Sequence, residues 1–454
     1  MDTFENVPFD EIEEGMGAEL VRRLSAHDIQ CFAALSGDVN PFHVDPDFAR
    51  DQGFEEIIAH GIWGASLISA AIGTRLPGPG TILVSQQLDF LQPIEAGDRI
   101  RTIVRVARKA AEGRCLTLDC RCERDDGEVV LKSTVEVIAP EQKLRHRRSK
   151  GVGGNRFDRL IAETKEALGE PVRCAVVNPI DEASLRGAVQ AAEAGLIEPV
   201  LIGAEQAIRA AAESAELEIE RFDLVEVRDA AAAAERASEL AAEGEVQMLM
   251  KGRLQTAELM KALVAEKRLR TDRIASHVFV VDVPRADRLL LITDAAITIA
   301  PDLDELRDIV QNAIDLAVAL GIEQPHVALL SATEAVRKGI ASTLDAAAIC
   351  KMADRGQITG GVIDGPLAFD NAISERAAAI KEISSPVAGR ADILVVPELV
   401  AGNMLAKQLD YLAGGKAAGV VVGLEIPVSL TSRADSPAER VASAAIAARV
   451  TTKA

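Results

Sequence analysis

Aromatic residues are scarce in this chain: they make up 3% of its 454 residues, with one tryptophan and one tyrosine. Hydrophobic residues nevertheless account for 48% of the sequence, so alanine, valine, leucine and isoleucine must fill its cores. Alanine-rich helical stretches beside Val- and Ile-rich strands favour an α/β chain over an all-β one. The length predicts two or three compact units rather than one domain.

Basic residues are also fewer than acidic ones. Fifty Lys and Arg residues face seventy Asp and Glu residues, which leaves a net charge of −20. A general nucleic-acid-binding protein needs a basic face that displaces counterions, so no nucleic-acid partner is expected. An anionic substrate remains possible, because local cations and helix N-termini bind phosphates even in an acidic protein.

The six cysteines have no disulfide-framework spacing, and the six histidines are scattered along the chain. Cys120 and Cys122 share a face of a predicted strand, but a metal site would need two more soft ligands nearby. We therefore expect reduced, mostly buried thiols and no metal. No cationic-then-apolar leader opens the sequence and no apolar run has spanning length, so we expect a cytoplasmic protein without a membrane partner.

Residues 1–142 read as one unit. An apolar helix is predicted over Gly61–Ile72, and four segments of alternating hydrophobicity follow it, separated by glycine-containing turns. A helix followed by several antiparallel strands predicts an α+β layer in which a sheet wraps one helix, which is the outline of a hot-dog domain. The four strand segments are Thr81–Phe90, Asp98–Arg108, Arg114–Arg124 and Val129–Ile138.

The sharpest local pattern of this unit runs from Ser36 to Asp45. A capping side chain precedes a proline at Asn40-Pro41 and again at Asp45-Pro46, so each pair predicts the start of a helical turn. Such tight geometry can bring Asp38 and His43 to one spot, where they could polarise a water molecule and pass protons. Gly61, after His60, opens the apolar helix, and its free N–H could stabilise negative charge on a carbonyl oxygen.

This pattern, Asp-x-Asn-Pro-x-His followed by His-Gly at a helix start, resembles the MaoC-like (R)-specific enoyl-CoA hydratases. The resemblance continues through Leu76-Pro77-Gly78, Gln86–Pro93 and Gly97-Asp98, and it covers nearly all of residues 10–138. It implies a hot-dog fold and hydration of trans-2-enoyl-CoA to (R)-3-hydroxyacyl-CoA.

By motif position, the resemblance assigns Asp38 and His43 as the catalytic dyad, Gly61 as the oxyanion donor and Ser69 as a pocket serine. A single Asp or His is more often a cap or a satisfied core residue, and only the combined motif favours a hydratase site. The neighbouring residues have structural interpretations: Asp45 and Asp47 as helix caps, His27 and His60 as structural, and Trp63 as packing or pocket wall.

Residues 143–155 interrupt the regular pattern. The basic run Leu144–Lys150 and the glycines after it predict a flexible linker. The alternative is a surface that binds the phosphates of coenzyme A. A solvated linker is favoured, because runs of like charge are usually exposed.

From residue 156 to residue 454, short apolar strands alternate with helices, which predicts a mostly parallel, doubly wound α/β region. Its length suggests two α/β subdomains that face a cleft, the second over roughly residues 285–425. The expected strands are Val172–Asn178, Pro199–Gly203, Asp223–Val227, Val246–Met250, Val278–Val283, Leu289–Ile292, Val327–Ser331, Ile358–Ile363, Ile393–Val396 and Gly419–Leu424.

Four polar segments follow predicted strands of this region, and we expect them on one edge of the sheet, where such folds bind anions. They are Met248–Thr256, Thr293-Asp294, Asp364–Asp370 and Ser429–Pro437. Together they resemble the phosphate acetyl/butyryltransferases, and the Lys-Gly-x-x-x-Thr and Thr-Ser-Arg-Ala-Asp-Ser forms are closer to the butyryl branch. The resemblance implies two subdomains like those of isocitrate dehydrogenase, and a reaction in which acyl-CoA and phosphate give acyl phosphate and CoA.

The same resemblance suggests roles for single residues. Ser432 would contact the CoA sulfur, and Arg433 would bind phosphate or the acyl carbonyl through its charged fork. The family's basic aspartate falls at Glu439, which could serve as the base, whereas Asp435 is a nearby acid out of register. The remaining candidates in this region bind the anionic substrate or shape its site: Lys251 (or else a structural ion pair), Gly252, Thr256, and Asp364 and Asp370, which equally could be caps.

The sequence therefore predicts a bifunctional enzyme of acyl-CoA metabolism without a cofactor, since CoA thioesters and phosphate are substrates. One alternative is an active hydratase whose C-terminal half binds acyl-CoA or phosphate without turnover. Another makes the first unit a thioesterase, which the Asp38/His43 motif disfavours. Both families usually form dimers or larger assemblies, so a homo-oligomer is expected by analogy.

Overall fold

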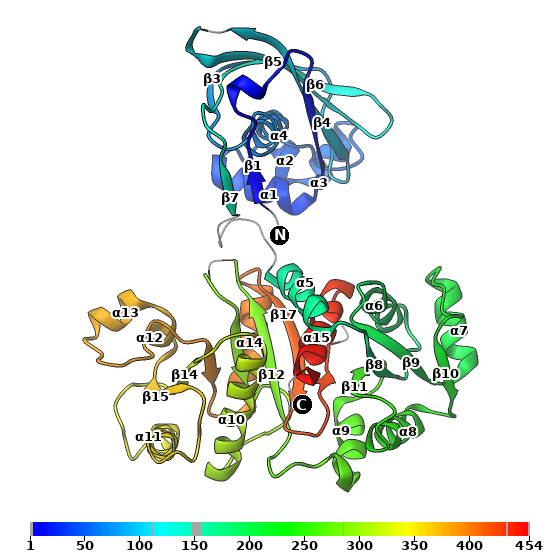
Figure 1. The fold of residues 1–454 in the computed structure, drawn as a ribbon, viewed down its shortest axis with the longest axis vertical. Helices are drawn as coiled ribbons and strands as arrows, with labels where there is room; N and C mark the ends of the chain where they lie inside the picture. The colour runs from blue at the N-terminus through cyan, green and yellow to red at the C-terminus, as the bar shows by residue number, and fades with distance from the viewer. Residues whose placement is uncertain (1–2, 111, 148–155, 285, 433–434, 453–454) are drawn as a thin grey trace. The chain divides into compact units, whose positions relative to one another are not determined.

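The computed structural model describes residues 3–110, 112–147, 156–284, 286–432 and 435–452. The chain divides into two compact units, Met1–Ser149 and Lys150–Ala454. Figure 1 shows the helices and strands of each unit. Within the described residues, no helix combines the length and the apolar character that crossing a bilayer requires.

Unit 1 is an antiparallel sheet laid against one helix. Its five strands have the order β2-β4-β5-β6-β3, and every pairing is antiparallel. Buried residues alternate with exposed ones along β4 to β6, as a sheet with one face on a core requires. The predicted hot-dog fold is confirmed, and Figure 1 shows α4 beside the sheet. The elements are β2 (Gly17–Arg23), α4 (Gly61–Thr74), β3 (Ile82–Phe90), β4 (Arg99–Ala110), β5 (Cys115–Glu123) and β6 (Val129–Ile138).

Shorter elements complete unit 1. A two-stranded ladder joins its two ends, because β1 (Thr3–Glu5) pairs with β7 (Arg145–Arg147). The predicted linker 143–155 therefore begins with a strand, and its residues 148–155 lie outside the described ones. Three helices fill the segment before α4, and a 3-10 turn precedes β2: α1 (Ala26–Ser36), α2 (Pro41–Val44), α3 (Pro46–Asp51) and η1 (Phe9–Glu11).

Unit 2 is built on one eleven-stranded sheet with the order β10-β9-β8-β11-β18-β17-β12-β13-β16-β14-β15. Seven neighbouring pairs are parallel, as predicted. Three consecutive pairs, β18-β17, β17-β12 and β12-β13, are antiparallel. The strands are β8 (Val172–Val177), β9 (Ile197–Gly203), β10 (Asp223–Glu226), β11 (Met248–Lys251), β12 (Ser276–Asp282), β13 (Leu290–Thr293), β14 (His326–Leu330), β15 (Val362–Leu367), β16 (Ile393–Val395), β17 (Lys416–Val422) and β18 (Val428–Ser429).

The antiparallel pairs reverse the sheet's direction. Strands β8 to β11 and β18 run one way, whereas β13, β16, β14 and β15 run the other way. Both predicted subdomains contribute strands to this single sheet, so no break in the sheet separates them. The carboxyl ends of the two groups of parallel strands consequently lie on opposite edges.

Helices cover both faces of this sheet (Figure 1). Aspartate or serine side chains cap the start of several of them, including Asp181, Asp229 and Asp302. The helices and short turns are α5 (Arg156–Leu168), α6 (Glu182–Glu193), α7 (Glu205–Ser214), α8 (Ala230–Ala242), α9 (Thr256–Ala265), η3 (Lys267–Leu269), α10 (Leu303–Ala319), α11 (Ala341–Asp354), α12 (Phe369–Ile373), α13 (Glu375–Ile380), α14 (Leu399–Tyr411) and α15 (Pro437–Thr451).

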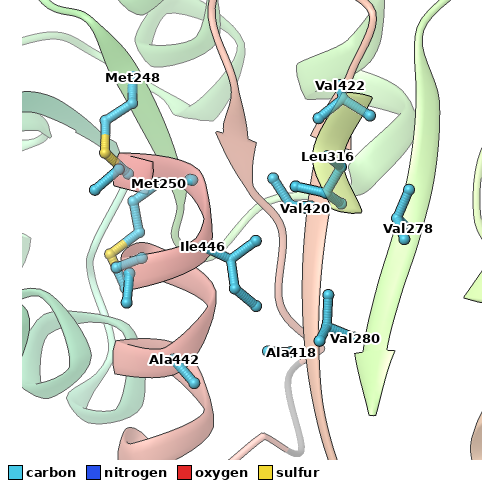
Figure 2. Close-up of a cluster of buried hydrophobic side chains, with 14 of the residues drawn as sticks. Met248, Met250, Val278, Val280, Leu316, Ala418, Val420, Val422, Ala442 and Ile446 are labelled. Atoms are coloured by element: carbon cyan, nitrogen blue, oxygen red, sulfur yellow. The ribbon is translucent and has the colours of Figure 1, made fainter. Parts of the chain in front are cut away.

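The terminal helix α15 is the centre of unit 2. Every residue from Arg440 to Ala448 is buried, and Figure 2 shows Ile446 directed towards Ala418 of β17, with Met248 and Met250 of β11 also beside the helix. Fully burying an isoleucine side chain such as Ile446 stabilises the fold by about 1.5–3 kcal/mol. Helix α15 packs against β11, β18 and β17, and its Arg440 is hydrogen-bonded to the loop that precedes it.

Candidate active sites in the two units

The segment around His43 folds as its prolines predict. Asn40 caps α2 by accepting the Phe42 N–H at 3.3 Å, and Pro41 occupies the first helical position. Asp45 caps α3 through the N–H groups of Asp47 and Phe48, in keeping with its structural interpretation. These two short helices hold His43 towards the start of α4.

The tautomer of His43 follows from its hydrogen bond. Nδ1 lies 2.8 Å from the carbonyl oxygen of Ile58, which can only accept, so Nδ1 carries the proton. In the neutral ring, Nε2 then has a free lone pair, and it lies 3.9 Å from Oδ2 of Asp38. The imidazole side chain is 11% exposed and the carboxylate 56%. A buried base therefore faces a solvent-accessible carboxylate.

His60 supports this pair. Its Nε2 donates to the backbone oxygen of Asp38 at 2.8 Å, and its ring stacks on that of His43 with centroids 3.7 Å apart. Its Nδ1 is buried and has no hydrogen-bond partner. Asp38, His43 and His60 each offer a ligand atom within 4.8 Å of the others, so these three could also hold a divalent ion. His60 thus positions the site, which agrees with its structural interpretation.

A hollow of about 320 Å³ opens beside His43 and the start of α4. Gly61 lines it, and a Cβ at this position would lie 3.1 Å from the ring of Phe90, so a side chain here would crowd the entrance. Gly61 is the first residue of α4, where backbone N–H groups lack a partner within the helix. The lining includes His43, Ile58, Gly61, Phe90, Ile94 and Leu131.

Two other predicted residues of α4 differ in position. Trp63 is 5% exposed and belongs to the core, as its packing interpretation requires. Ser69 lies more than two turns beyond Gly61, is exposed, and does not line the hollow. The structure therefore brings Asp38, His43 and Gly61 together, but it does not bring Ser69 to them.

In unit 2, Lys251 ends β11 and is 5% exposed. Its Nζ donates to the backbone oxygen of Thr431 at 3.3 Å, which links β11 to the loop after β18. Gly252 follows, and a Cβ there would lie 2.4 Å from the oxygen of Val177. The Gly252 N–H already donates to that oxygen at 2.9 Å, so its role is close packing. Thr256 is the first residue of α9.

The loop from Thr431 to Ser436 is fastened by a buried arginine, Arg440, which is 4% exposed. Its two terminal nitrogens donate to Oγ1 of Thr431 and to the backbone oxygen of Ser432, each at 2.8 Å. Gly187 of α6 makes the necessary room, because a Cβ there would lie 2.8 Å from Cδ of Arg440. Ser432 is exposed at this loop, and Arg433 lies outside the described residues.

Glu439 and Asp435 have different environments. Glu439 is the third residue of α15 and forms a capping box, in which its Oε2 accepts from the N–H and the hydroxyl of Ser436 at 2.8 and 2.7 Å. Oδ2 of Asp435 accepts the Ser432 N–H at 2.7 Å. Burial, with Glu439 and Asp410 nearby, raises the pKa of Asp435 to about 6 against the hydrogen bond from Ser432.

The other predicted strand ends are far from Lys251. The expectation that all four lie on one edge is wrong, because the three antiparallel pairs put the ends of β13 and β15 on the opposite edge. Asp294 is buried there and accepts backbone N–H groups of His277, Ala296, Ile297 and Thr298.

Asp364 and Asp370 lie at the far end of the sheet. Strand β15 starts four residues later than predicted, so Asp364 is inside the strand and accepts the Gly365 N–H at 2.9 Å. Asp370 pairs with Lys381 at 3.0 Å, and this hydrogen bond lowers its pKa. Seven strand spacings of about 4.8 Å separate β15 from β11. Both environments favour a structural role within this chain.

Sequence reasoning missed Arg440 and the strand that orders its loop. β18 has two residues, too few for any hydrophobic period, and Arg440 begins the buried stretch Arg440–Ala448, whose other residues are apolar or serine. A single arginine within an alanine-rich stretch was the available signal, since an arginine is rarely buried without several acceptors.

Comparisons with known proteins match both units. A model of the phosphate acetyl/butaryl transferase family matches residues 227–448, and a MaoC like domain model matches residues 8–116. The phosphate acetyltransferase of Rhizobium meliloti is 55% identical over 295 residues, 65% of this chain and 93% of that protein. The phosphate butyryltransferase of Clostridium beijerinckii is 40% identical over 295 residues, 65% of this chain and 97% of that protein.

A solved structure agrees with these matches. The crystal structure of a branched-chain phosphotransacylase from Enterococcus faecalis V583 superposes with a TM-score of 0.55 at 33% sequence identity, and the match covers 62% of this chain and 99% of that one. The chain therefore belongs to the phosphate acetyl/butyryltransferase family through its second unit, and its first unit is similar to the MaoC like domain.

Proposed function

We propose that this protein is a bifunctional acyl-CoA enzyme. Its first unit hydrates trans-2-enoyl-CoA to (R)-3-hydroxyacyl-CoA, and its second unit transfers acyl groups reversibly between CoA and phosphate. The observation that carries the hydratase half is the free Nε2 of His43, 3.9 Å from Asp38 and beside the hollow at the start of α4. The transferase half is supported by 55% identity to a phosphate acetyltransferase.

The proposed hydration adds one water molecule across the enoyl double bond. Nε2 of His43 takes a proton from a water molecule while the water oxygen bonds to the β-carbon of the enoyl group. Electron density moves to the thioester oxygen, where the first N–H groups of α4 stabilise it. The proton then returns to the α-carbon through the His43–Asp38 pair, so one water is added and no charge is lost.

The transfer needs cations for phosphate and a donor or base for the CoA sulfur. Lys251 supplies a buried positive charge at the carboxyl end of β11. Ser432 is exposed on the loop that Lys251 contacts through Thr431. This pairing of a buried cation with a polar loop suits a doubly charged phosphate group.

The test uses the purified full chain in two assays. We expect crotonyl-CoA to lose its conjugated enoyl absorbance, and butyryl-CoA or acetyl-CoA with phosphate to release CoA. If CoA release stays at the blank rate while hydration proceeds, the second unit is a binding module rather than a transferase. If crotonyl-CoA instead loses its thioester, the first unit is a thioesterase.

Self-association is the second part of the proposal. Strand β3 is an edge of the unit 1 sheet and carries exposed apolar side chains at Ile82, Leu83 and Val84. An exposed apolar edge strand is a pairing surface, and a second copy of β3 would cover it. The mass measured by light scattering should be that of a dimer or larger, and a monomer would contradict this part.

The thiols support a cytoplasmic location. All six cysteines are free; Cys31 and Cys115 are exposed, whereas Cys120 and Cys122 are buried, and burial raises their pKa values to about 12 and about 11. Protonated, buried thiols resist oxidation and are typical of proteins from reducing compartments. A protein recovered with these cysteines in disulfides would argue against this location.

A further inference from the structure

The proposed acyl transfer needs a group that accepts the proton of the CoA thiol, because the thiolate is the nucleophile. Two carboxylates near Ser432 are candidates. Glu439 occupies the position at which the family resemblance expects the base. Asp435 precedes it by four residues and lies at the end of the same loop.

The carboxylate of Glu439 caps the start of helix α15. Its Oε2 holds both the N–H and the hydroxyl of Ser436, and the Glu439 N–H returns a bond to that hydroxyl at 3.4 Å. This capping box satisfies N–H groups that would otherwise be orphaned at the start of α15. A carboxylate held in this way stabilises the helix start and is directed back at Ser436.

Asp435 is held against the loop instead. Its Oδ2 accepts the Ser432 N–H at 2.7 Å, and Arg440 donates to the backbone oxygens of both residues, at 2.8 Å to Ser432 and at 3.3 Å to Asp435. Because Arg440 is buried, the loop that carries the Asp435 carboxylate is fastened to the core of unit 2. The carboxylate is therefore fixed beside the residue that the resemblance places at the CoA sulfur.

We propose that Asp435, and not Glu439, accepts the proton of the CoA thiol when an acyl phosphate is the acyl donor. This assignment rests on the proposed transferase function. The thiol S–H bond breaks as the proton moves to Asp435, and the sulfur forms a bond to the acyl carbon. The bond from that carbon to the phosphate oxygen breaks, phosphate leaves with the electron pair, and the proton passes from Asp435 to it.

The charges around Asp435 suit this task. Among the described residues, Asp410 of α14 and Glu439 of α15 face it with negative charge, and Arg440 of α15 faces it with positive charge. Burial and the two carboxylates raise the pKa of Asp435 to about 6, close to the pH at which the enzyme would work. The carboxylate is ionised above this pH, so the rate should fall as the pH drops through about 6.

The experiment compares Asp435→Asn with Glu439→Gln in the full chain, with butyryl phosphate and CoA as substrates. This direction avoids inorganic phosphate, which itself titrates near neutral pH. Asparagine keeps an oxygen that can accept the Ser432 N–H, and glutamine keeps the capping box, so both variants should fold. Unchanged crotonyl-CoA hydration and an unchanged melting temperature are the checks on folding.

We expect Asp435→Asn to lower kcat on the order of 10²–10⁴-fold with little change in the KM for CoA, because only the proton transfer is lost. The residual rate of this variant should no longer fall as the pH drops through about 6; this fall is called the acidic limb of the pH–rate profile. Glu439→Gln should change kcat by less than about threefold, since a capping box accepts either residue. Asp435→Glu should restore part of the lost rate and, with it, the limb.

Asp410→Asn is the matched control, because it removes a neighbouring carboxylate that caps no helix in the described residues. It should leave kcat nearly unchanged and move the limb to lower pH, since one negative charge no longer opposes ionisation of Asp435.

Two outcomes would overturn the assignment while the proposed function stands: a Glu439→Gln enzyme that loses the rate, or an Asp435→Asn enzyme that keeps it or its limb. A wild-type chain without any transfer would overturn the proposed function and this assignment together.

Discussion

The two sites are built differently. In unit 1, His43 and Gly61 line the hollow, Asp38 lies 3.9 Å from His43, and all three come from residues 38–61; a short capped helix holds His43. In unit 2, Lys251 and the loop after β18 lie 180 residues apart in the chain, and the buried helix α15 holds the loop in place. The first site is set by local turn geometry, whereas the second depends on the packing of the whole unit.

This difference has energetic consequences. A substitution at the first site removes a group from a preformed turn, and Asn40 and Asp45 still cap their helices. A substitution near the second site also disturbs strand β11 or helix α15, which carry the core of unit 2. We therefore expect chemistry and stability to separate cleanly in unit 1. In unit 2 we expect them to be coupled at the buried residues Lys251 and Gly252, but not at Asp435 of the loop.

The largest effect is expected for Asp38→Asn. Hydration of crotonyl-CoA should fall about 10²–10⁴-fold, because the pair that passes the proton loses its carboxylate. Asparagine can still accept the Asn40 N–H, which lies 3.3 Å from Oδ1, so the melting temperature should not change. The measurement is the initial rate of loss of enoyl absorbance.

Asp47→Asn is the control for this variant, because Asp47 lies on α3, its side chain is 90% exposed and it pairs with Arg50. It should hydrate at the wild-type rate. An Asp38→Asn enzyme with near wild-type hydration would show that Asp38 only caps its turn.

A smaller effect is expected for Lys251→Met. Removing a charged partner of phosphate should cost about 1.5–3 kcal/mol, or roughly 10- to 150-fold, mainly as a higher KM for phosphate. The comparison variant is Lys261→Met, on the exposed side of α9. An unchanged KM for phosphate together with a lowered melting temperature would make Lys251 a structural residue.

The smallest effect is expected for Gly252→Ala, and it should be on stability. The new Cβ would lie 2.4 Å from the oxygen of Val177, so β11 must shift from β8, at about 1–3 kcal/mol. Gly339→Ala is the matched control, because a Cβ there meets no atom within 4 Å. Denaturant unfolding of each variant measures the difference, and equal midpoints would contradict the packing argument.

The sequence predicted those features that local chemistry determines. The alternation of apolar and polar residues located β3 to β6. The two capping residues that each precede a proline, Asn40 and Asp45, located the turn that carries His43. Strand β15 was placed too early, because Gly365-Pro366 has the form of a turn although it lies within the strand. Helix α15 has apolar residues all around, so it lacks the period that marks a surface helix.

The sequence pattern could not predict whether neighbouring strands run parallel or antiparallel. The three antiparallel pairings β18-β17, β17-β12 and β12-β13 reverse the sheet and put the ends of β11 and β13 on opposite edges. A strand's period shows which face is buried but not which way its partner runs. Because β18 has only two residues, the Ser432 loop was expected to follow the predicted strand Gly419–Leu424, and it follows β18.

Assaying two variants for both activities tests the central claim, that two chemically independent sites share this chain. Asp38→Asn and Lys251→Met are each assayed for both crotonyl-CoA hydration and butyryl transfer to phosphate. We predict that Asp38→Asn loses hydration and keeps transfer, and that Lys251→Met keeps hydration and transfers more slowly at phosphate concentrations below its KM. A folded variant in which both activities fall together would contradict the claim.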